Sequence, residues 1–232
     1  MDCSILIPTL RERSSTLSQV VTELRRQLEN VSFTYELLID ADDRQSTLGN
    51  KRNRLVREAR GEYIVFLEDD DFTHPEFFKT YEPMFISRQY DLGEIYGLRY
   101  DNEVIDRPVH YSVHYVKHVP WYNSPTIYIR SPCHITPMRT SLARTVQWPD
   151  ITWGEDHEFS YRFQKFALAN RPLVQFPAPS TVPMYHYFDN MRTTRASRLP
   201  IYNYAKQQFD FEPYEEKPNE LLVARTGPTL HM

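Results

Sequence analysis

The apolar run at residues 63–67, Tyr-Ile-Val-Phe-Leu, limits the possible folds more than any other feature of the chain. A strand with one face in water alternates apolar and polar residues, but this run is apolar at every position. Both faces of the strand must therefore be covered, as they are in parallel sheets with helices on each side. The run predicts a buried parallel strand.

The segments before this run alternate between strand and helix patterns. Residues 3–7 and 35–39 predict two more strands, and residues 47–60 predict a helix that leads into the run. Between the first two strands, apolar residues recur with helical spacing at Leu17, Val20, Val21, Leu24 and Leu28. The resulting βαβαβ order predicts an α/β fold with a Rossmann-like, doubly wound, mostly parallel sheet.

The second half of the chain has a less regular pattern. Residues 109–115 alternate in polarity and predict a half-exposed strand, and residues 155–169 predict a helix with an aromatic face. A length of 232 residues suits a single domain. We expect one domain with two halves and a C-terminal extension: residues 1–205, divided into 1–100 and 101–205, and residues 206–232.

Composition excludes several classes of protein. The formal net charge of −4 argues against broad, nonspecific binding to nucleic acid. Cys3 and Cys133 stand far apart without metal-ligand spacing, which argues against a disulfide or zinc site and favours a reducing compartment. The N-terminus lacks the form of a signal peptide, and no apolar stretch approaches the roughly 20 residues that span a bilayer. We therefore expect a soluble, cytoplasmic protein without a membrane span.

Four adjacent acids, residues 68–71, directly follow the buried strand. Like charges at this spacing repel one another unless a cation neutralises them. In open parallel sheets, ligands bind beyond the carboxyl ends of the strands, and Mg²⁺ or Mn²⁺ is commonly held by one or two carboxylates plus substrate phosphates. The cluster predicts a metal and phosphate site. The alternative is an acidic turn that caps the helix predicted after Thr73.

Several motifs occur together along the chain. They are Ser-Ile-Leu-Ile-Pro-Thr at 4–9, Leu-Ile-Asp at 38–40, Leu-Gly-Asn-Lys-Arg-Asn at 48–53, Gly-Glu-Tyr-Ile-Val-Phe-Leu-Glu-Asp-Asp-Asp at 61–71, Pro-Met-Arg at 137–139 and Trp-Gly-Glu-Asp at 153–156. In this combination the chain resembles the family 2 glycosyltransferases, and most closely their short phage- and virus-type members. The resemblance implies a GT-A fold whose first half binds a nucleotide sugar and whose second half binds the acceptor.

The resemblance implies a metal site for Mn²⁺ or Mg²⁺. Glu68 and Asp70 match the outer positions of the family's DxD motif, with Glu where the family usually has Asp. Asp70 would be the principal ligand. His186 resembles the C-terminal histidine that completes the metal site in many GT-A enzymes, and the alternative for it is a buried histidine with a structural hydrogen bond.

The resemblance also implies where the nucleoside diphosphate binds, with a UDP-sugar favoured as the donor. Asp42 or Asp40 would hydrogen-bond the base, and Thr9, Arg11 and Arg52 would line the nucleoside and diphosphate pocket. The full expected donor-binding set is Pro8, Thr9, Arg11, Asp40, Asp42, Lys51, Arg52, Glu68 and Asp69. For the two helical cations in this set, ordinary solvated charges are the alternative.

The resemblance assigns catalysis to the start of the helix predicted at 155–169. Asp156 matches the catalytic base, with Glu155 as the alternative base. The base would take the proton of an acceptor hydroxyl, and one base with one displacement gives inversion at the anomeric carbon. The competing interpretation is that Asp156 only caps the helix, where an acid is favoured.

These expectations combine into a metal-dependent, inverting glycosyltransferase. One rival is a metal-dependent nucleotidyltransferase or phosphohydrolase, although the chain has no Gly-rich phosphate loop. The other rival is a non-catalytic carbohydrate- or nucleic-acid-binding module, against which the retention of both Asp70 and Asp156 argues.

The acceptor is left open between a glycan, a protein and a hydroxymethylated DNA base, in the host cytoplasm if the protein is viral. Four aromatic residues are candidates for an acceptor platform or for core packing: Trp121, Tyr122, Trp148 and Trp153. Three arginines at a spacing of three would share one face of a helix, either for DNA phosphates or as a solvated face: Arg192, Arg195 and Arg198.

Overall fold

The first half of the chain alternates strands and helices in the predicted order. The computed structural model describes residues 1–101, 104–117, 121–179, 181–189, 198–203, 206 and 208–213. The elements up to residue 101 are β1 (Cys3–Leu10), the 3-10 helix η1 (Arg11–Arg13), α1 (Ser14–Leu28), β2 (Tyr35–Asp42), α2 (Leu48–Glu58), β3 (Tyr63–Phe66), β4 (Phe72–Thr73), α3 (Phe77–Ser87), β5 (Leu92–Gly93) and β6 (Ile95–Asp101). The predicted βαβαβ order is confirmed.

The second half has shorter strands and longer connections. Its elements are β7 (Val104–Tyr111), the 3-10 helix η2 (Val113–Lys117), β8 (Trp121–Asn123), β9 (Tyr128–Arg130), β10 (Met138–Arg139), α4 (Thr140–Thr145), α5 (Glu155–Ala169), β11 (Gln175–Phe176), β12 (Tyr185–Asp189), β13 (Arg198–Asn203) and β14 (Gln208–Pro213). Helix α5 has the predicted bounds.

The strand predicted at 109–115 is wrong in its second part, because β7 ends at Tyr111. Ser112 starts a turn there. Its hydroxyl accepts a hydrogen bond from the backbone N–H of His114 at 3.2 Å, and its carbonyl accepts one from Tyr115 at 3.2 Å. A serine side chain that bonds the nearby backbone competes with the strand ladder, so the chain continues as η2.

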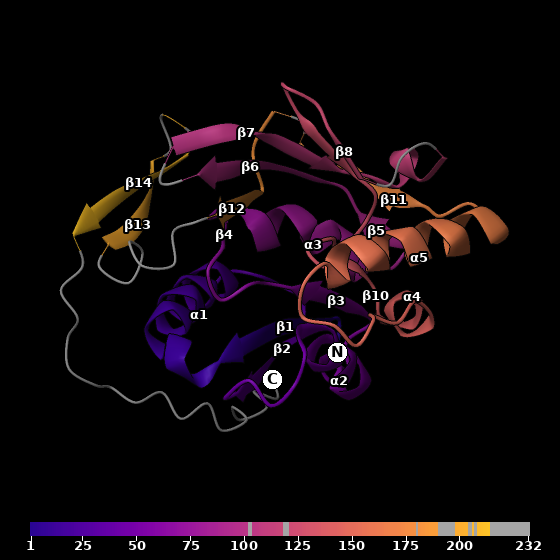
Figure 1. Ribbon diagram of the computed structural model, residues 1–232, viewed down its shortest axis with the longest axis horizontal. Coiled ribbons are helices and arrows are strands. Elements are labelled where there is room, and N and C mark those ends of the chain that lie inside the picture. The colour runs from indigo at the N-terminus through magenta and orange to yellow at the C-terminus, as the bar shows by residue number, and fades with distance from the viewer. Residues whose placement is uncertain are drawn as a thin grey trace.

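The first sheet contains the predicted parallel strands (Figure 1). Its strand order is β11-β5-β10-β3-β1-β2. Strand β1 is parallel to both β2 and β3, with Cys3 in register with Tyr35 and Tyr63, and β10 is antiparallel to β3. Because parallel neighbours end at the same edge of a sheet, the residues that follow β1, β2 and β3 meet there. The doubly wound α/β core is confirmed.

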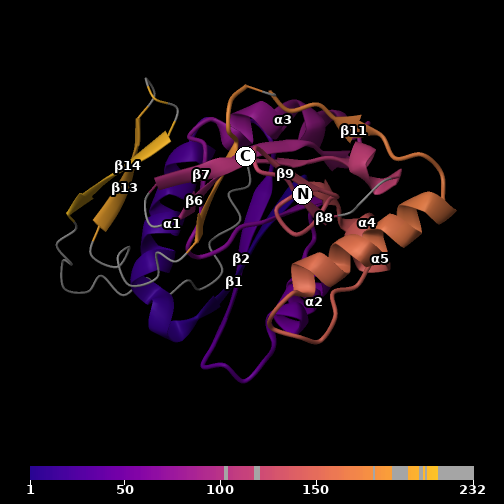
Figure 2. The ribbon, with the colours of Figure 1, turned by 45° about the horizontal axis from the view of Figure 1, so that its top comes forward.

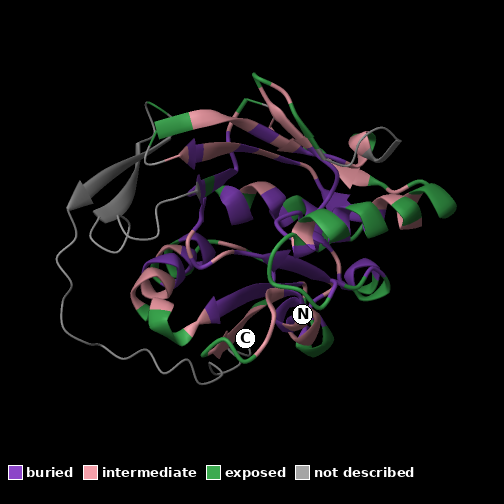
Figure 3. Ribbon diagram, in the orientation of Figure 1, coloured by how far each residue is buried: buried purple, intermediate pink, exposed green. Residues whose placement is uncertain are grey.

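Strand β3 is covered on both faces, as its apolar run predicts. Tyr63 and Val65 belong to a core that includes residues of α1 and α3, whereas Ile64 and Phe66 belong to a core with α2, α4 and α5. All four side chains are at most 1% exposed. Figure 3 shows β1 and β3 as buried ribbons, whereas α1, α2 and α5 have exposed outer turns.

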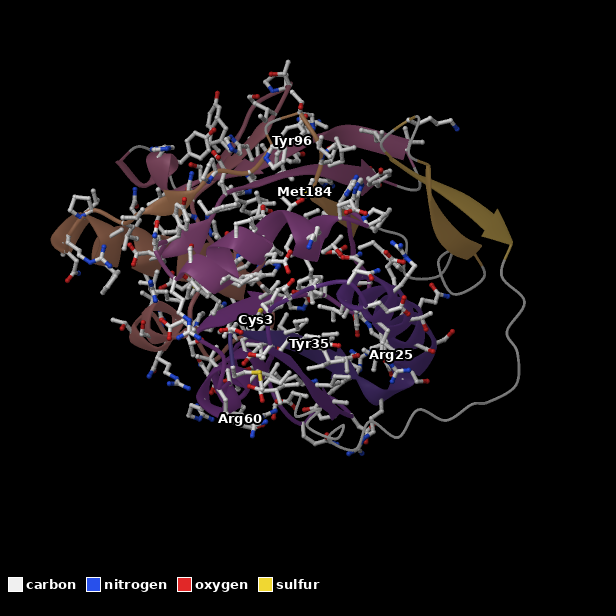
Figure 4. All side chains as sticks on the ribbon, turned by 180° about the vertical axis from the view of Figure 1, so that it is seen from behind. Cys3, Arg25, Tyr35, Arg60, Tyr96 and Met184 are labelled. Carbon is white, nitrogen blue, oxygen red and sulfur yellow. The ribbon has the colours of Figure 1, made fainter. Side chains whose placement is uncertain are left out.

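A second six-stranded sheet, which the sequence does not predict, lies beyond α3 (Figure 1). Its order is β4-β12-β6-β7-β9-β8, with mixed parallel and antiparallel pairs. Figure 4 labels Tyr96 and Met184 in this layer and Cys3 and Tyr35 in the first sheet. Strand β4 directly follows the acidic cluster and pairs with β12. The second sheet therefore brings β12 close to the carboxyl end of β3.

The described part of the C-terminal region is a hairpin of β13 and β14, in which Asn203 is in register with Gln208. It spans the domain boundary predicted at 205/206, and residues 214–232 lie outside the described residues. Of the three arginines predicted to share a helix face, Arg192 and Arg195 lie outside the described residues and Arg198 begins β13. In the described part of the chain, no helix has the length and apolar character that crossing a membrane requires.

Candidate active site

A cavity of about 540 Å³ lies at the carboxyl ends of β1 and β3. This volume is typical of small-molecule sites, which span roughly 300–1,000 Å³. Its wall consists of Pro8, Thr9, Leu10, Arg13, Arg44, Ser46, Leu48, Lys51, Arg52, Glu68, Asp70, His134, Thr152, Trp153, Gly154, Glu155, Asp156, Tyr187 and Phe188. Open parallel sheets bind ligands at this edge.

The cavity brings together most of the residues that the sequence singles out. The predicted residues that line it are Pro8, Thr9, Lys51, Arg52, Glu68, Asp70, Glu155 and Asp156. The predicted residues that do not line it are Arg11, Asp40, Asp42, Asp69 and His186. Residues 145 positions apart in the chain, from the end of β1 at Leu10 to the start of α5 at Glu155, therefore share one wall.

Arg52 connects the acidic cluster to the start of α5. It is 1% exposed, and its Nη2 donates hydrogen bonds to Glu68 and, at 3.1 Å, to Oε1 of Glu155. Its guanidinium lies 5.2 Å from the ring centroid of Phe66. Burial disfavours the charged form, but the carboxylates of Glu68 and Glu155 outweigh it and raise the pKa of Arg52. The alternative of a solvated surface charge is wrong for this residue.

Lys51 is also buried, with 3% exposure. Its Nζ donates to the carbonyl of Thr9 and pairs with Asp42. Asp42 also accepts backbone N–H bonds from Arg44 at 3.1 Å and Ser46 at 2.9 Å. Burial opposes ionisation of Asp42, but these hydrogen bonds prevail and lower its pKa. Asp42 therefore shapes the loop behind the cavity wall instead of lining the cavity.

Asp40 and Arg11, two other predicted donor-binding residues, have protein partners away from the cavity. Asp40 holds Arg54 through two hydrogen bonds of 2.9 and 3.1 Å. Arg11 pairs with Asp43 at 2.8 Å, and its side chain is 66% exposed. Arg13 occupies the cavity wall instead. In a 3-10 helix with three residues per turn, side chains two positions apart point in different directions, so only one of these two arginines faces the cavity.

Asp69 and Asp70 share Arg13 as a cation. Its Nη1 lies 2.5 Å from Oδ1 of Asp69 and 3.3 Å from Oδ2 of Asp70. Asp69 is 1% exposed and also accepts a hydrogen bond from the Thr9 hydroxyl. Burial and the neighbouring charge of Asp70 raise the pKa of Asp69 to about 6. The side chain of Asp70 is 25% exposed and lines the cavity, so it is the acid of this pair that a ligand can reach.

Asp71 and β12 position the aromatic part of the wall. Asp71 is buried and accepts hydrogen bonds from the Tyr185 hydroxyl at 2.7 Å and the Phe188 N–H at 2.9 Å. Tyr187 and Phe188 line the cavity as a result. His186, between Tyr185 and Tyr187, is fully buried, and its Nδ1 lies 3.1 Å from the Tyr100 hydroxyl. Burial lowers the pKa of His186 to about 3, so the ring is neutral.

His134 lines the cavity but carries no motif in the sequence. Its Nε2 lies 3.3 Å from Oε1 of Glu68, and burial together with Arg52 lowers its pKa to about 3. Within the described residues, its Nδ1 and the Nη1 of Arg52 are buried without a hydrogen-bond partner. Such groups cost about 1–3 kcal/mol each and are typical of functional sites. Sequence reasoning missed His134 because the irregular segment before β10 gives no positional signal.

The residues around the cavity suit a divalent cation such as Mg²⁺ that is held partly by substrate phosphates. Among the described residues, no three His, Cys, Asp or Glu side chains converge as a ready-made metal site. Mg²⁺, however, is usually held by one or two carboxylates together with substrate phosphates. Asp70 offers such a carboxylate on the wall, next to cationic residues that suit a phosphate. The donor set therefore suits a cation that arrives with a diphosphate.

Helix α5 starts at the cavity and carries both candidate bases. Gly154 is its N-cap, with a φ of 77°, and no side chain caps the helix. Asp156 therefore does not occupy the N-cap position, although an acid in the first turn is still favoured by the helix dipole. Glu155 is 4% exposed and paired with Arg52, and burial raises its pKa. Asp156 lines the cavity, is partly exposed and accepts a hydrogen bond from the adjacent His157 N–H at 2.8 Å.

The loop before α5 is docked on the start of α2 (Figures 1 and 2). Gly49 donates its N–H to the Ile151 carbonyl at 3.0 Å, and a Cβ at this glycine would lie 1.7 Å from the Pro149 carbonyl oxygen. Three further residues complete the contact: Thr47 and Asn50 donate to Asp150 at 2.6 and 2.7 Å, and Asn53 bonds the Trp148 backbone in both directions. The motif at 48–53 therefore holds the loop with some residues and lines the cavity with Lys51 and Arg52.

The sequence matches no protein-family model and no curated protein. Among solved structures, the chain is similar to S. aureus TarS, a family 2 glycosyltransferase with the GT-A fold. TarS 1–349 with UDP-GlcNAc has a TM-score of 0.58 and 14% identity, covering 82% of this chain and 59% of that one. TarS 1–349 with UDP has a TM-score of 0.56 and 13% identity, covering 82% and 61%.

A third structure, TarS 1–349 without a stated ligand, has a TM-score of 0.53 at 13% identity and covers 81% of this chain and 60% of that one. The chain thus spans about three fifths of TarS 1–349. At such low identity the likeness concerns the fold. The chain has the GT-A glycosyltransferase fold that the sequence predicts.

Proposed function

We propose that this chain transfers a sugar from a nucleoside-diphosphate donor to an acceptor hydroxyl, with inversion and with the help of a divalent cation. One observation carries the proposal: cationic side chains that suit a diphosphate and a carboxylate that suits a general base line the same cavity. We call Thr9, Arg13, Lys51, Arg52 and Asp70 the donor side. We call Trp153, Gly154, Asp156 and Tyr187 the acceptor side.

The donor side supports binding of a diphosphate. Arg13, Lys51 and Arg52 bring positive charge to the carboxyl ends of the first-sheet strands, where nucleotides bind in open α/β folds. Arginine and lysine are the residues that proteins use for phosphate groups. The complexes of TarS with UDP-GlcNAc and UDP favour a UDP-sugar for this chain.

Asp70 is the residue that we expect to hold Mn²⁺ or Mg²⁺, because its carboxylate lines the cavity and is partly exposed. A bound cation would neutralise the charge of the leaving nucleoside diphosphate. Glu68 is engaged by Arg52 and has His134 at 3.3 Å, so we assign it a supporting part. We leave His186 out of the proposed site, since it is fully buried and does not line the cavity.

Asp156 is the proposed general base. It lines the cavity from the first turn of α5, where it is partly exposed, whereas Glu155 is buried against Arg52. A base must reach the hydroxyl whose proton it removes. Asp156 would accept that proton as the acceptor oxygen attacks the anomeric carbon from the face opposite the diphosphate. Holding the donor and acceptor in line would contribute a large part of the rate.

Two rival functions remain distinguishable from this proposal. A nucleotidyltransferase or phosphohydrolase would cleave the diphosphate, and a non-catalytic module would bind a sugar without turnover. The glycan, the protein and the hydroxymethylated DNA base stay as acceptor candidates, and the viral subgroup and cytoplasmic location stay predictions. Arg192 and Arg195, which bear on the DNA candidate, lie outside the described residues.

The decisive experiment measures release of UDP from a panel of UDP-sugars, with Mn²⁺, with Mg²⁺ and with excess chelator. We expect slow, cation-dependent release without an acceptor, and loss of release in Asp70→Ala with an unchanged circular dichroism spectrum. Release of UMP or inorganic phosphate instead of UDP would favour the rival enzymes. Full activity in excess chelator would contradict the metal assignment, and binding without any turnover would favour the module.

A further inference from the structure

Trp153 is the most exposed large apolar side chain in the described part of the chain, at 77%. It also lines the cavity, three residues before Asp156. Burying a large apolar side chain stabilises a protein by roughly 1.5–3 kcal/mol, and an exposed indole does not contribute this free energy. A tryptophan in this setting is therefore well suited to cover a ligand that enters the cavity.

The backbone around Trp153 is fixed on both sides. Residues 148–151 are docked on α2 through Gly49, Asn50 and Asn53, and α5 begins two residues after the indole. Gly154, with a φ of 77°, makes the turn between the two. A ligand that stacks on a side chain held in this way orders little additional chain, which lowers the entropic cost of binding.

The charges near Trp153 favour a neutral ligand. The first turn of α5 carries Glu155, Asp156 and Glu158. Arg162 pairs with Glu158 at 3.0 Å. Glu155 and Asp156 both line the cavity, but Glu155 is 4% exposed and paired with Arg52, so Asp156 is the more accessible carboxylate of the two. The carboxylate of Asp156 would repel phosphate groups of an acceptor. It would accept hydrogen bonds from the hydroxyl groups of a neutral acceptor.

A second aromatic side chain completes the acceptor side. Tyr187 comes from β12, is 38% exposed and lines the cavity. Aromatic faces of this kind bind the apolar faces of rings, while the phenol hydroxyl offers a polar group. The acceptor side thus combines two aromatic surfaces with one carboxylate. A serine or threonine side chain offers no ring for the indole to stack on. A nucleobase could stack there, but its DNA strand would bring phosphates toward the carboxylate of Asp156.

We infer that the acceptor is a neutral saccharide whose terminal ring stacks on Trp153 and presents a hydroxyl to Asp156. This inference rests on the proposed function and chooses among its acceptor classes. Trp153 and Tyr187 select the acceptor, and Asp156 acts on its hydroxyl.

The first test measures binding without the donor. Wild-type protein is titrated with a panel of neutral oligosaccharides of α and β linkage while tryptophan fluorescence is recorded. Trp148 is 2% exposed and stacked on Phe159 at 4.0 Å, so its signal should not respond to a sugar at the surface. We expect saturable quenching that Trp153→Ala abolishes and Trp153→Phe retains in part. Quenching by none of the panel, or equal quenching in Trp153→Ala, overturns the inference.

The second test measures transfer with the UDP-sugar that wild type hydrolyses. The acceptors are the same oligosaccharides, a Ser/Thr peptide and a hydroxymethylcytosine oligonucleotide. Trp153→Ala should raise the acceptor KM by roughly five- to tenfold, the loss of one aromatic stacking contact, with an unchanged donor KM. Leu168→Ala, which truncates a 58% exposed residue near the end of α5 and away from the cavity, is the matched control and should change neither value.

The two proposals fail in different ways. If no UDP-sugar is bound or hydrolysed, the proposed function is wrong. If a UDP-sugar is hydrolysed but only the peptide or the oligonucleotide accepts the sugar, the function holds and the saccharide inference is wrong. Trp153→Phe keeps a ring at the same position, so its partial activity separates lost stacking from a disturbed fold.

Discussion

The donor side and the acceptor side of the cavity are built in different ways. On the donor side, Lys51 and Arg52 are at most 3% exposed and have carboxylate partners, so their charges are fixed before any ligand arrives. On the acceptor side, Trp153 is largely exposed and its position follows from the backbone that holds it. If the proposed function is right, a charged ligand would meet buried ion pairs, whereas a neutral ligand would meet a rigid exposed surface.

The largest expected effect tests the acceptor side. Asp156→Asn removes the proposed base and should lower kcat by about 10²- to 10⁴-fold, because an amide cannot accept a proton at neutral pH. Donor binding should be nearly unchanged. The free energy of unfolding should stay within roughly 1 kcal/mol, because the asparagine oxygen can still accept the His157 N–H and only the interaction of the charge with the helix dipole is lost. Steady-state kinetics and urea denaturation measure these quantities. If Asp156→Asn turns over like wild type while Glu155→Gln is inactive, Glu155 is the base.

The next effect tests whether buried ion pairs hold the donor side. Arg52→Met leaves Glu68 and Glu155 without their shared cation and should lower the free energy of unfolding by about 3–5 kcal/mol. The matched control on the same helix is Arg54→Met, whose pair with Asp40 is more exposed. That variant should lose about 1 kcal/mol or less. Equal losses in urea denaturation for the two variants would contradict the contrast between the two sides.

A smaller effect tests whether the backbone fixes the acceptor side. The methyl of Gly49→Ala would lie 1.7 Å from the Pro149 carbonyl oxygen, so the loop before α5 must move. A displacement of this kind should lower kcat/KM for the acceptor by roughly 10- to 100-fold. The donor KM serves as the internal control and should change little. A rise in donor KM alone would show that α2, and not the loop, had moved.

The smallest effect separates two neighbouring arginines of η1. Arg13→Gln removes a charged donor from the cavity wall and should raise the donor KM by about tenfold, the loss of one hydrogen bond to a charged group. Arg11→Gln breaks only an exposed pair with Asp43 and should change the donor KM by less than about twofold. Donor kinetics at saturating acceptor provide the comparison. The opposite ranking would return Arg11 to the donor site.

The sequence predicts the three longest strands of the first sheet, β1, β2 and β3, because their signals are local, whereas the two-residue strands β5, β10 and β11 were not predicted. The continuous apolar run at 63–67 predicts a buried strand, and the helical spacing of apolar residues before β2 predicts which face of α1 packs on the sheet. The bounds of helix α5 were predicted correctly for the same reason. The second sheet was not predicted, since β12 pairs with strands far away in the sequence, β4 has only two residues, and β8 and β9 have three each.

The candidate site shows the same limit. The motifs predicted which segments meet, and Lys51, Arg52, Asp70 and Asp156 do line one cavity. They did not predict whether Arg11 or Arg13 faces the cavity. That choice depends on the direction of each side chain in the 3-10 helix η1, which the sequence pattern does not reveal. His134 was missed because only tertiary contacts bring it beside Glu68.

The docking of the loop on α2 has a consequence for how such a protein can evolve. With the proposed function, the stretch at 48–53 would serve both substrates, because Gly49, Asn50 and Asn53 hold the loop and Lys51 and Arg52 line the donor side. A change in it would disturb both specificities at once. The exposed turn at 152–154 would contact the acceptor alone. With these assignments, acceptor preference could change through a few surface positions while the residues proposed to bind the nucleotide stay the same.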